Sequence, residues 1–157
     1  MESLVVRRMT ANDLDAVLPL AALPFLSPWT RGMFLEEMNH STSHCFVIKM
    51  KELLGDHVVG FICFRIVGDE SELLNICVDP RYRRLGIGKK LMKFYTLFCR
   101  KRKVRTFFLE VNAVNVPAVH LYELFSYESL GTRKGFYHGE RESRSDALIM
   151  RRSLCPG

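Results

Sequence analysis

The sequence predicts a mixed α+β fold, and two patterns carry this prediction. In the first half, apolar and β-branched runs at residues 44–50, 57–67 and 72–78 are separated by turn residues, which is typical of an antiparallel, hairpin-rich sheet. After residue 80 helical and strand-like spacings alternate, and such a strand-helix-strand-helix unit implies local parallel pairing. With 157 residues, 48% of them apolar and 25% charged, we expect a single domain over residues 1–157.

The N-terminal third combines one strand with two helices. Residues 4–8 alternate weakly, as a strand does, and residues 12–13 (Asn-Asp) are candidate caps for a helix through Leu20. Prolines are then expected to interrupt the pattern, and a second helix is expected after Thr30 and through Met38. The interrupting residues are Pro19, Pro24 and Pro28.

The second half alternates helices and strands. A helix is expected from residue 87, because apolar residues recur at helical spacing on one face. Residues 104–111 are interpreted as a strand, and Asn115 is a candidate N-cap for the helix that follows. Residues 131–138 and 147–152 are expected to be closing strands. The apolar face of the first of these helices consists of Ile87, Leu91, Tyr95 and Phe98.

Composition limits the compartment and the cofactors. Five cysteines without a CxxC pair, three of them in apolar runs, indicate free thiols and a reducing cytoplasm. Among the histidines, His40 and His44 have a possible ligand spacing but no third ligand nearby, so we expect no metal. The apolar stretch 16–26 contains two prolines and is shorter than the roughly 20 residues of a membrane span, so no membrane partner is expected.

The chain is basic, and its positive charge is concentrated. Its 23 basic and 17 acidic residues give a net charge of +6, with the excess in residues 81–90 and 100–105. An anionic ligand or partner fits this distribution, although a solvated helix end alone could account for the second run. The runs lack interleaved aromatic residues and a known RNA-binding motif, so no specific nucleic-acid partner is expected.

The most informative stretch is residues 75–90. A strand is expected to end there, a basic loop with two glycines follows, and a helix begins at once. Glycines allow close approach of a ligand, and the free N–H groups at a helix N-terminus favour a phosphate. The stretch is neither a P-loop nor a dinucleotide fingerprint, because it lacks GxxxxGK[ST] and the third glycine of GxGxxG. Taken alone, it fits a tight turn equally well.

A family resemblance makes this stretch specific. Arg83-Arg84-Leu85-Gly86-Ile87-Gly88 resembles the Q/R-x-x-G-x-G/A motif with which GNAT acetyltransferases bind the pyrophosphate of coenzyme A. Residues 72–80, residues 109–112 with Asn115, and residues 118–123 follow in the order and spacing of the RimI-type enzymes of that family. Pro28-Trp29-Thr30 is also similar to an element of those enzymes, so the resemblance covers nearly the whole chain.

The resemblance implies a fold, a co-substrate and a site. The fold would be the three-layer GNAT fold with a splayed, mostly antiparallel sheet, the co-substrate acetyl-CoA, and the substrate the N-terminal alanine of a small-subunit ribosomal protein. Glu110 would be the general base and Tyr122 the general acid. The peptide would lie between residues 23–30, including Trp29, and the loop near Tyr137. The residues that would bind coenzyme A are Ile76, Cys77, Val78, Arg83, Arg84, Leu85, Gly86, Ile87, Gly88, Lys89 and Asn115.

This chemistry requires such residue types. An α-amino group has a reference pKa of about 8, so at neutral pH most of it is protonated and cannot attack a thioester. Glu110 could accept the proton directly or through a water, and a phenol such as Tyr122 could protonate the departing sulfur. Backbone N–H groups at residues 76–78 could polarise the thioester carbonyl. Cys77 is a weaker alternative as an acetyl-carrying nucleophile, because it has no evident histidine partner in the sequence.

Other functions stay open at this point. The same fold could acetylate a small amine such as a polyamine or aminoglycoside, although no acidic cluster occurs in residues 23–30. A non-catalytic acetyl-CoA sensor or nucleic-acid-binding module is a third reading, and the presence of Glu110 and Tyr122 argues against it. A monomer is favoured, although the sequence does not fix the oligomeric state. One departure from the family is Ser126 where glycine is usual, and a left-handed Ser126 would carry about 1 kcal/mol of strain.

Overall fold

The central sheet has seven strands in the computed structural model, which describes residues 3–22, 28–138 and 144–154. The strand order is β1-β2-β3-β4-β5-β7-β6, and all neighbouring strands are antiparallel except β4 and β5, which are parallel. This confirms the predicted mixed fold with its local parallel pair. The strands are β1 (Ser3–Arg8), β2 (Ser43–Glu52), β3 (Gly55–Val67), β4 (Glu70–Val78), β5 (Thr106–Asn112), β6 (Glu128–His138) and β7 (Arg144–Ser153).

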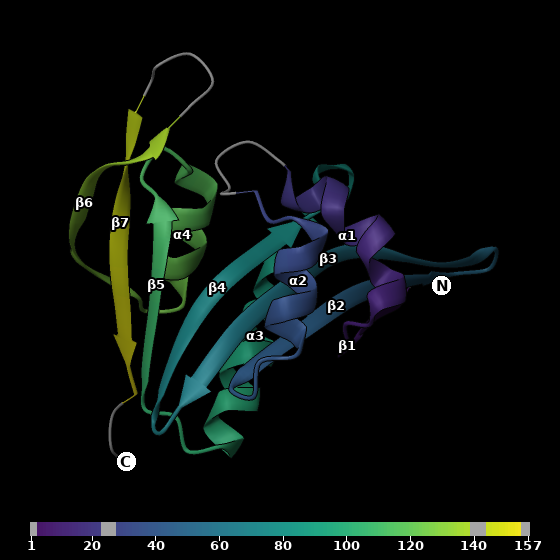
Figure 1. The fold of residues 1–157 in the computed structure, drawn as a ribbon, viewed down its shortest axis with the longest axis horizontal. Coiled ribbons are helices and arrows are strands. Elements are labelled where there is room, and N and C mark those ends of the chain that lie inside the picture. Colours follow the sequence, from purple (N-terminus) through teal and green to yellow (C-terminus); the bar gives the residue numbers. More distant parts are fainter. Residues whose placement is uncertain (1–2, 23–27, 139–143, 155–157) are drawn as a thin grey trace.

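Helices cover both faces of the sheet (Figure 1). The helices α1 and α2 pack on one face, and α3 and α4 pack on the other, which confirms the three-layer GNAT fold that the resemblance implied. Along the described parts of the chain, no helix is long and apolar enough to cross a membrane. The helices are α1 (Leu14–Ala21), α2 (Arg31–Met38), α3 (Ile87–Lys101) and α4 (Val116–Leu124), and two short 3-10 turns are η1 (Ala11–Asp13) and η2 (Pro80–Tyr82).

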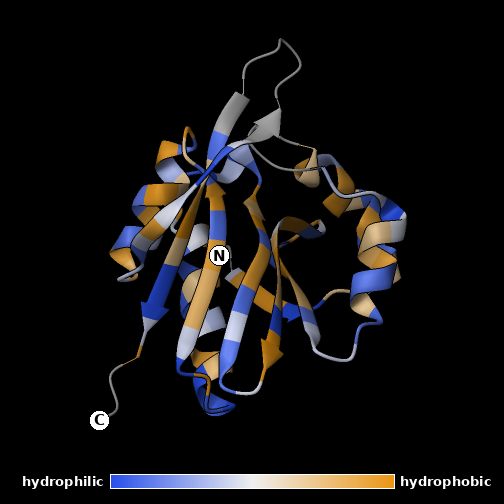
Figure 2. Ribbon diagram, turned by 60° about the vertical axis from the view of Figure 1, so that its left-hand side comes forward, coloured by the Kyte–Doolittle hydropathy of each residue, from blue (hydrophilic) through white to orange (hydrophobic). Residues whose placement is uncertain are grey.

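Alternation along the strands builds a separate core on each face. In β2, Phe46 and Ile48 belong to the core under α3, whereas Cys45 and Val47 belong to the core under α1 and α2. Successive strand residues point to opposite faces, so a strand buried on both sides reads as a continuous apolar run. Figure 2 shows hydrophobic stretches along the central strands. The sequence predicted the strands at 44–50, 57–67 and 72–78 from such runs.

Two predicted boundaries were wrong. Pro19 lies inside α1 instead of interrupting it. The helix tolerates it because proline removes only one backbone hydrogen bond, the one to the carbonyl of Asp15. Asp15 is exposed, so water can solvate that carbonyl instead. The strand expected from residue 104 begins at Thr106, because the N–H of Val104 bonds to the carbonyl of Cys99, 3.1 Å away, and closes α3.

The end of α4 has the backbone strain expected from its sequence. Ser126 has a φ of 67°, and its N–H bonds to the carbonyl of Glu123, 2.9 Å away. The N–H of Tyr127 bonds to the carbonyl of Tyr122, 3.1 Å away, and the two tyrosine rings lie 5.9 Å apart. These bonds form a Schellman motif in which serine occupies the left-handed position that glycine normally takes.

Candidate active site

The parallel pairing between β4 and β5 ends before either strand does. Residues 70–73 of β4 pair with residues 106–109 of β5, whereas β4 continues to Val78 and β5 to Asn112. Figure 1 shows the two strands diverging beyond the paired region. This edge of β4 therefore has no strand partner among the described residues, and its main-chain groups are available to a ligand. Ile76, Cys77 and Val78 lie in this unpaired stretch.

A β-bulge at Leu74 decides which side chains of β4 face which helices. The register with β3 shifts at this residue, which is the extra one. Beyond it, Ile76 and Val78 pack against the core under α3 and α4, whereas Cys77 belongs to the core under α1 and α2. Asn75, two residues before Cys77, shares its face.

The Cys77 thiol is buried and engaged. Its Sγ donates a hydrogen bond to the carbonyl of Leu20 in α1, 3.3 Å away. Burial raises the pKa of this thiol to about 11, so it is protonated at neutral pH. A thiol, unlike a thiolate, is a poor nucleophile, which argues against a covalent acetyl-cysteine intermediate.

The loop between β4 and α3 has features of an anion-binding cradle. Arg84 and Gly86 have φ angles of 67° and 74°. Left-handed residues of this kind help successive N–H groups to converge on an anion. Gly86 is the N-cap of α3 and supplies no side-chain cap, so the first N–H groups of the helix have no side-chain cap from the described residues.

Unpaired cations surround this loop. Arg83, Arg84 and Lys89 are exposed, and none forms an ion pair with a described residue. Arg81 behaves differently, because its Nη2 lies 2.8 Å from Asp79 Oδ2. Its hydrogen bonds hold the pKa of Asp79 below the usual value. Arg81 is thus neutralised, while the cations that follow it remain available to an anion.

The first turn of α3 lies close to α4. A Cβ atom at Gly88 would lie 3.2 Å from Leu121 Cδ2, so glycine permits this helix contact. The side chain of Ile87, the first residue of α3, is buried, whereas that of Leu85 is 54% exposed. The side chain of Ile87 is therefore committed to the core, and its main-chain N–H is the group that a ligand could reach.

Glu110 is an ion-paired carboxylate in β5. Its Oε1 lies 2.8 Å from Arg133 Nη2, and its side chain is 29% exposed. Phe107 and Leu109 point into the core under α3, so alternation directs Glu110 to the opposite face, toward α1 and α2. A partly exposed carboxylate side chain at this position could accept a proton.

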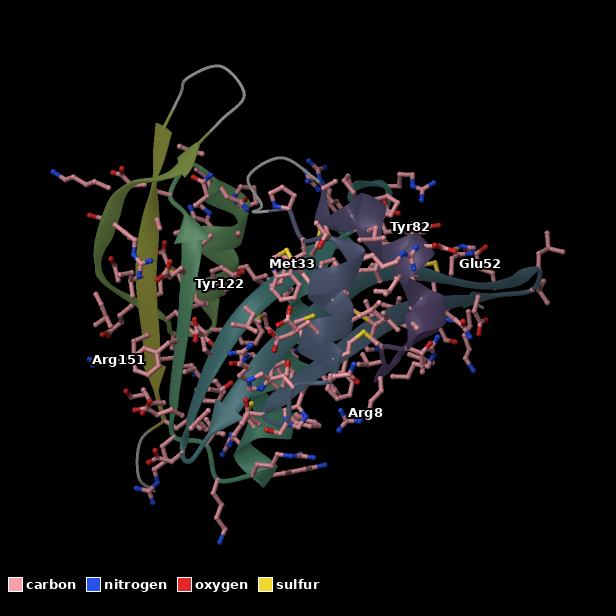
Figure 3. The ribbon with its side chains drawn as sticks, in the orientation of Figure 1. Arg8, Met33, Glu52, Tyr82, Tyr122 and Arg151 are labelled. Carbon is pink, nitrogen blue, oxygen red and sulfur yellow. The ribbon has the colours of Figure 1, made fainter. Side chains whose placement is uncertain are left out.

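Tyr122 comes from α4, on the other side of the sheet. It is 5% exposed and belongs to the core under α3 and α4, and it is labelled in Figure 3. Asn115 begins this helix, because its side chain accepts the N–H of Ala118, 3.4 Å away, and Pro117 occupies the first turn. This confirms the predicted cap and fixes where Tyr122 enters the core.

The predicted peptide contacts are described in part. Trp29 is half-buried, and its ring lies 5.0 Å from that of Phe34. Tyr137 is a residue of β6, but its side chain lies outside the described residues, as do residues 23–27. The structure therefore places Trp29 at the start of α2 and leaves its relation to the Tyr137 side chain a prediction.

Two adjoining cavities lie on the face of the sheet that Glu110 shares. One of about 220 Å³ includes Trp29 and Glu37 in its lining, and one of about 370 Å³ includes Glu72 and Phe108. His40 and Arg65 line both. Phe108 and Glu110 are two residues apart in β5, so their side chains point to the same face, about 7 Å apart along the strand. Phe108 lines the larger cavity, whereas Glu110 is in the lining of neither, so the cavities share a face of the sheet with Glu110 but are not built around it.

Asn75 is a candidate that the sequence analysis did not single out. It is 7% exposed, and its side chain makes no hydrogen bond with any described residue. Its amide atoms are not among the fully buried polar atoms of the described residues, so water or a ligand can reach and satisfy them. The signal was present in the sequence, where Asn75 interrupts the apolar run 73–78, but the spacing alone does not distinguish a ligand contact from a core hydrogen bond.

Comparison with known proteins decides the family. The model of the acetyltransferase (GNAT) family matches residues 14–127 of this chain. The chain belongs to the GNAT family. Membership makes it an N-acetyltransferase, an acyltransferase that uses acetyl-CoA.

Similar proteins extend this result over the whole chain. The chain is 33% identical over 145 residues, 92% of each chain, to a Bacillus subtilis (strain 168) protein predicted to be a ribosomal protein bS18-alanine N-acetyltransferase. The crystal structure of the ribosomal-protein-S18-alanine N-acetyltransferase from Escherichia coli superposes with a TM-score of 0.85 at 27% identity, covering 99% of this chain and 96% of that one. Arabidopsis thaliana NAA60 in complex with acetyl-CoA shares the fold, with a TM-score of 0.84 at 19% identity over 97% of this chain and 99% of that one. The resemblance to the RimI-type GNAT enzymes is confirmed.

Proposed function

We propose that this GNAT enzyme acetylates the N-terminal amine of another protein, namely the alanine that begins a small-subunit ribosomal protein. The observation that carries the proposal is the 33% identity, over 92% of both chains, to the Bacillus subtilis relative. Likeness of fold alone would leave the acceptor open, because one fold hosts many substrates. We propose one GNAT domain over residues 1–157.

Main-chain groups would hold the co-substrate. The uncapped N–H groups at the start of α3 fit a pyrophosphate, and Arg84 and Lys89 would add charge-assisted hydrogen bonds. The unpaired edge of β4 at residues 76–78 would hold the pantetheine and acetyl part, and Asn115 would contact the cofactor near the start of α4. Bound acetyl-CoA supplies the activated acyl group. The proposal involves no metal.

Glu110 and Tyr122 would manage two proton transfers. The acceptor amine must lose a proton before it attacks, and Glu110 would accept it directly or through a water. The nitrogen then bonds to the thioester carbon, the carbon–sulfur bond breaks, and Tyr122 would protonate the departing sulfur. N–H groups on the unpaired edge of β4 would stabilise the carbonyl oxygen as it gains charge. The burial of the Cys77 thiol, its hydrogen bond to the carbonyl of Leu20 and its pKa of about 11 support direct transfer over an acetyl-cysteine intermediate.

The test is a panel of peptides. The enzyme is incubated with acetyl-CoA and with peptides that begin with Ala, Ser, Met or Lys, and mass spectrometry locates the added acetyl group. We expect α-amine acetylation of the Ala peptide, and none of the same peptide with a blocked N-terminus. Absence of an α-amine product from every peptide would reject the proposal.

A second candidate is a small-molecule amine as acceptor. Acidic residues do line the cavities, although on α2 and β4 instead of within residues 23–30. Glu37 is neutralised by Arg65, whose Nη2 lies 2.7 Å from Glu37 Oε1, which reduces the attraction for a polyamine. A kcat/KM for spermidine above that for the Ala peptide would favour this candidate over the first.

We also propose that the enzyme acts in the cytoplasm. The cysteines that the structure describes, Cys45, Cys63, Cys77 and Cys99, are all free and buried, which suits a reducing compartment. A ribosomal-protein acceptor would be met there. Monomeric state remains part of the proposal, to be measured by light scattering.

A further inference from the structure

The basic residues of this chain are strongly segregated. Residues 81–105 contain 11 of its 23 lysines and arginines and no aspartate or glutamate. Part of this charge faces the coenzyme A cradle described above. The rest lies beyond it, at the C-terminal end of α3, in a cluster that we call the α3-end patch. The patch consists of Arg100, Lys101, Arg102, Lys103 and Arg105, all exposed.

The α3-end patch is too far from the cradle to serve the cofactor pyrophosphate. The helix has 15 residues, which correspond to about 22 Å from its first turn to its last. The patch is also not neutralised within the protein. None of its side chains forms an ion pair with a described residue, whereas Arg7, Arg65 and Arg81 are each paired with a carboxylate.

The helix dipole explains only part of this charge. Cations in the last helical turn are favourable, which accounts for Arg100 and Lys101. Lys103 lies past the helix with a φ of 63°, a left-handed position that glycine would occupy with about 1 kcal/mol less strain. Neither the helix dipole nor the backbone conformation favours a lysine at this position, so the charge of Lys103 is a part of the patch that the helix end does not explain.

Arg102 gives the patch a fixed, flat cationic surface. Its guanidinium carbon lies 3.5 Å from the centroid of the Phe98 ring, and its Nη1 donates to the carbonyl of Phe98, 3.2 Å away. Arg8 of β1 approaches the same ring, at 6.0 Å. Burial lowers the pKa of neighbouring His44, and the charges of Arg8 and Arg102 lower it further, which reflects the positive potential here.

We propose that the α3-end patch binds the sugar-phosphate backbone of RNA without sequence preference. Regularly spaced phosphates match several unpaired cations, and no base-reading motif is needed. A membrane surface fits less well, because Val104, between Lys103 and Arg105, is buried, and the exposed Leu97 one turn earlier is a single apolar side chain. The choice of RNA as the polyanion rests on the proposed function, since a ribosomal-protein acceptor lies in an RNA-rich particle. Bound RNA would keep the enzyme near its acceptor while leaving Glu110 on the opposite face of the sheet open.

The test measures RNA binding apart from catalysis. A fluorescein-labelled RNA hairpin of about 20 base pairs is titrated by anisotropy, with saturating acetyl-CoA present so that the cradle is blocked. The patch variant combines R100Q, K101Q and K103Q. The control variant combines K51Q, K134Q and R151Q, which remove the same charge from exposed positions elsewhere. Figure 3 shows Arg151 on β7, and since its neighbour Arg152 donates to Thr96 of α3, Arg151 points to the other face.

We expect the patch variant to bind the hairpin at least tenfold more weakly than the control. The slope of log K against log salt concentration should also fall by an amount that corresponds to about three phosphate contacts. Peptide acetylation by the patch variant should be unchanged. Equal weakening in both variants would overturn the proposal, since it would reflect net charge alone. Tighter binding to vesicles with anionic lipid than to RNA would also overturn it. Because the peptide assay contains no RNA, loss of RNA binding with intact acetylation, or the reverse, separates this inference from the proposed function.

Discussion

Arg133 in β6 and Glu110 in β5 form an ion pair of 2.8 Å although β7 lies between their strands. Two side chains must therefore extend across a whole strand to meet. An arginine fork holds a carboxylate in a defined orientation. If Glu110 is the base, Arg133 decides which of its oxygens faces the acceptor amine.

Replacing Arg133 with glutamine should impair turnover by removing this positioning. We expect kcat to fall by about tenfold, because a displaced catalytic group loses rate steeply, while the affinity for acetyl-CoA stays unchanged. Steady-state kinetics with the Ala peptide measure the first quantity and calorimetry the second. The neighbouring exposed Lys134→Gln variant is the control and should behave as wild type. A normal kcat for the Arg133 variant would show that the ion pair does not orient the base.

Two tyrosines near the end of α4 allow a matched test of the general acid. Tyr122→Phe should lower kcat by about 10² or more, because the departing sulfur loses its proton donor, with little change in acetyl-CoA affinity. Tyr127→Phe should leave kcat unchanged, and it should not destabilise the protein, because the Tyr127 hydroxyl is buried without a hydrogen-bond partner among the described residues. Equal losses in both variants would indicate a packing effect and not proton transfer.

The sequence predicted the fold well where the signal was local. Continuous apolar runs located β2, β3 and β4, and the helical spacing from Ile87 located α3, because both patterns follow directly from burial. The boundaries at Pro19 and Thr106 were missed for a different reason. Each depends on a single backbone hydrogen bond. At Pro19 one helical bond is lost without ending the helix, and before Thr106 the N–H of Val104 bonds back to the preceding helix. The spacing of apolar residues does not indicate either bond.

The site was predictable as a set of residues but not as a geometry. The glycine loop and the residues after it could be matched to a family motif, so Gly86 and Tyr122 were named in advance. The ion pair of Glu110 with Arg133 could not be predicted from the sequence, because their strands are both neighbours of β7 and are not neighbours of each other. Asn75 was missed because its burial depends on a bulge at the previous residue, which shifts the face that it occupies.

Gly86 tests the anion cradle. A valine at this position must adopt a φ near 74°, which is strained for any residue with a Cβ and more so for a β-branched one. A Cβ added at this position meets no described atom within 4 Å, so the fold should survive. Gly86→Val should therefore weaken acetyl-CoA binding by about tenfold or more in calorimetry. Gly131→Ala, also without a neighbour within 4 Å and with no positive φ, is the control and should bind normally.

The reactivity of the Cys77 thiol tests whether the acetyl group is transferred directly to the acceptor amine. Its pKa of about 11 leaves about one thiol in a thousand ionised at pH 8, and the reactive fraction should rise as the pH approaches 11. Iodoacetamide should therefore fail to alkylate Cys77 in the folded enzyme at pH 8 and succeed after unfolding, as peptide mass mapping would show. Cys77→Ala should retain most of the turnover. An acetylated Cys77 peptide trapped during turnover would contradict direct transfer.

Ser126 gives a prediction about stability that is independent of catalysis. Its φ of 67° places a Cβ where steric contact with the backbone costs about 1 kcal/mol, and both hydrogen bonds of the Schellman motif come from main-chain groups that glycine retains. Ser126→Gly should therefore raise the free energy of unfolding by up to about 0.5 kcal/mol after the greater chain entropy of glycine is subtracted, and raise Tm by up to about 2 °C. Scanning calorimetry and urea unfolding measure both. Ser129→Gly, in the extended strand β6, is the control and should lower Tm instead, because there glycine relieves no strain and adds only entropy to the unfolded chain. Should Ser126→Gly leave Tm unchanged or lower it, the serine hydroxyl must make a compensating interaction that offsets the strain of the left-handed backbone.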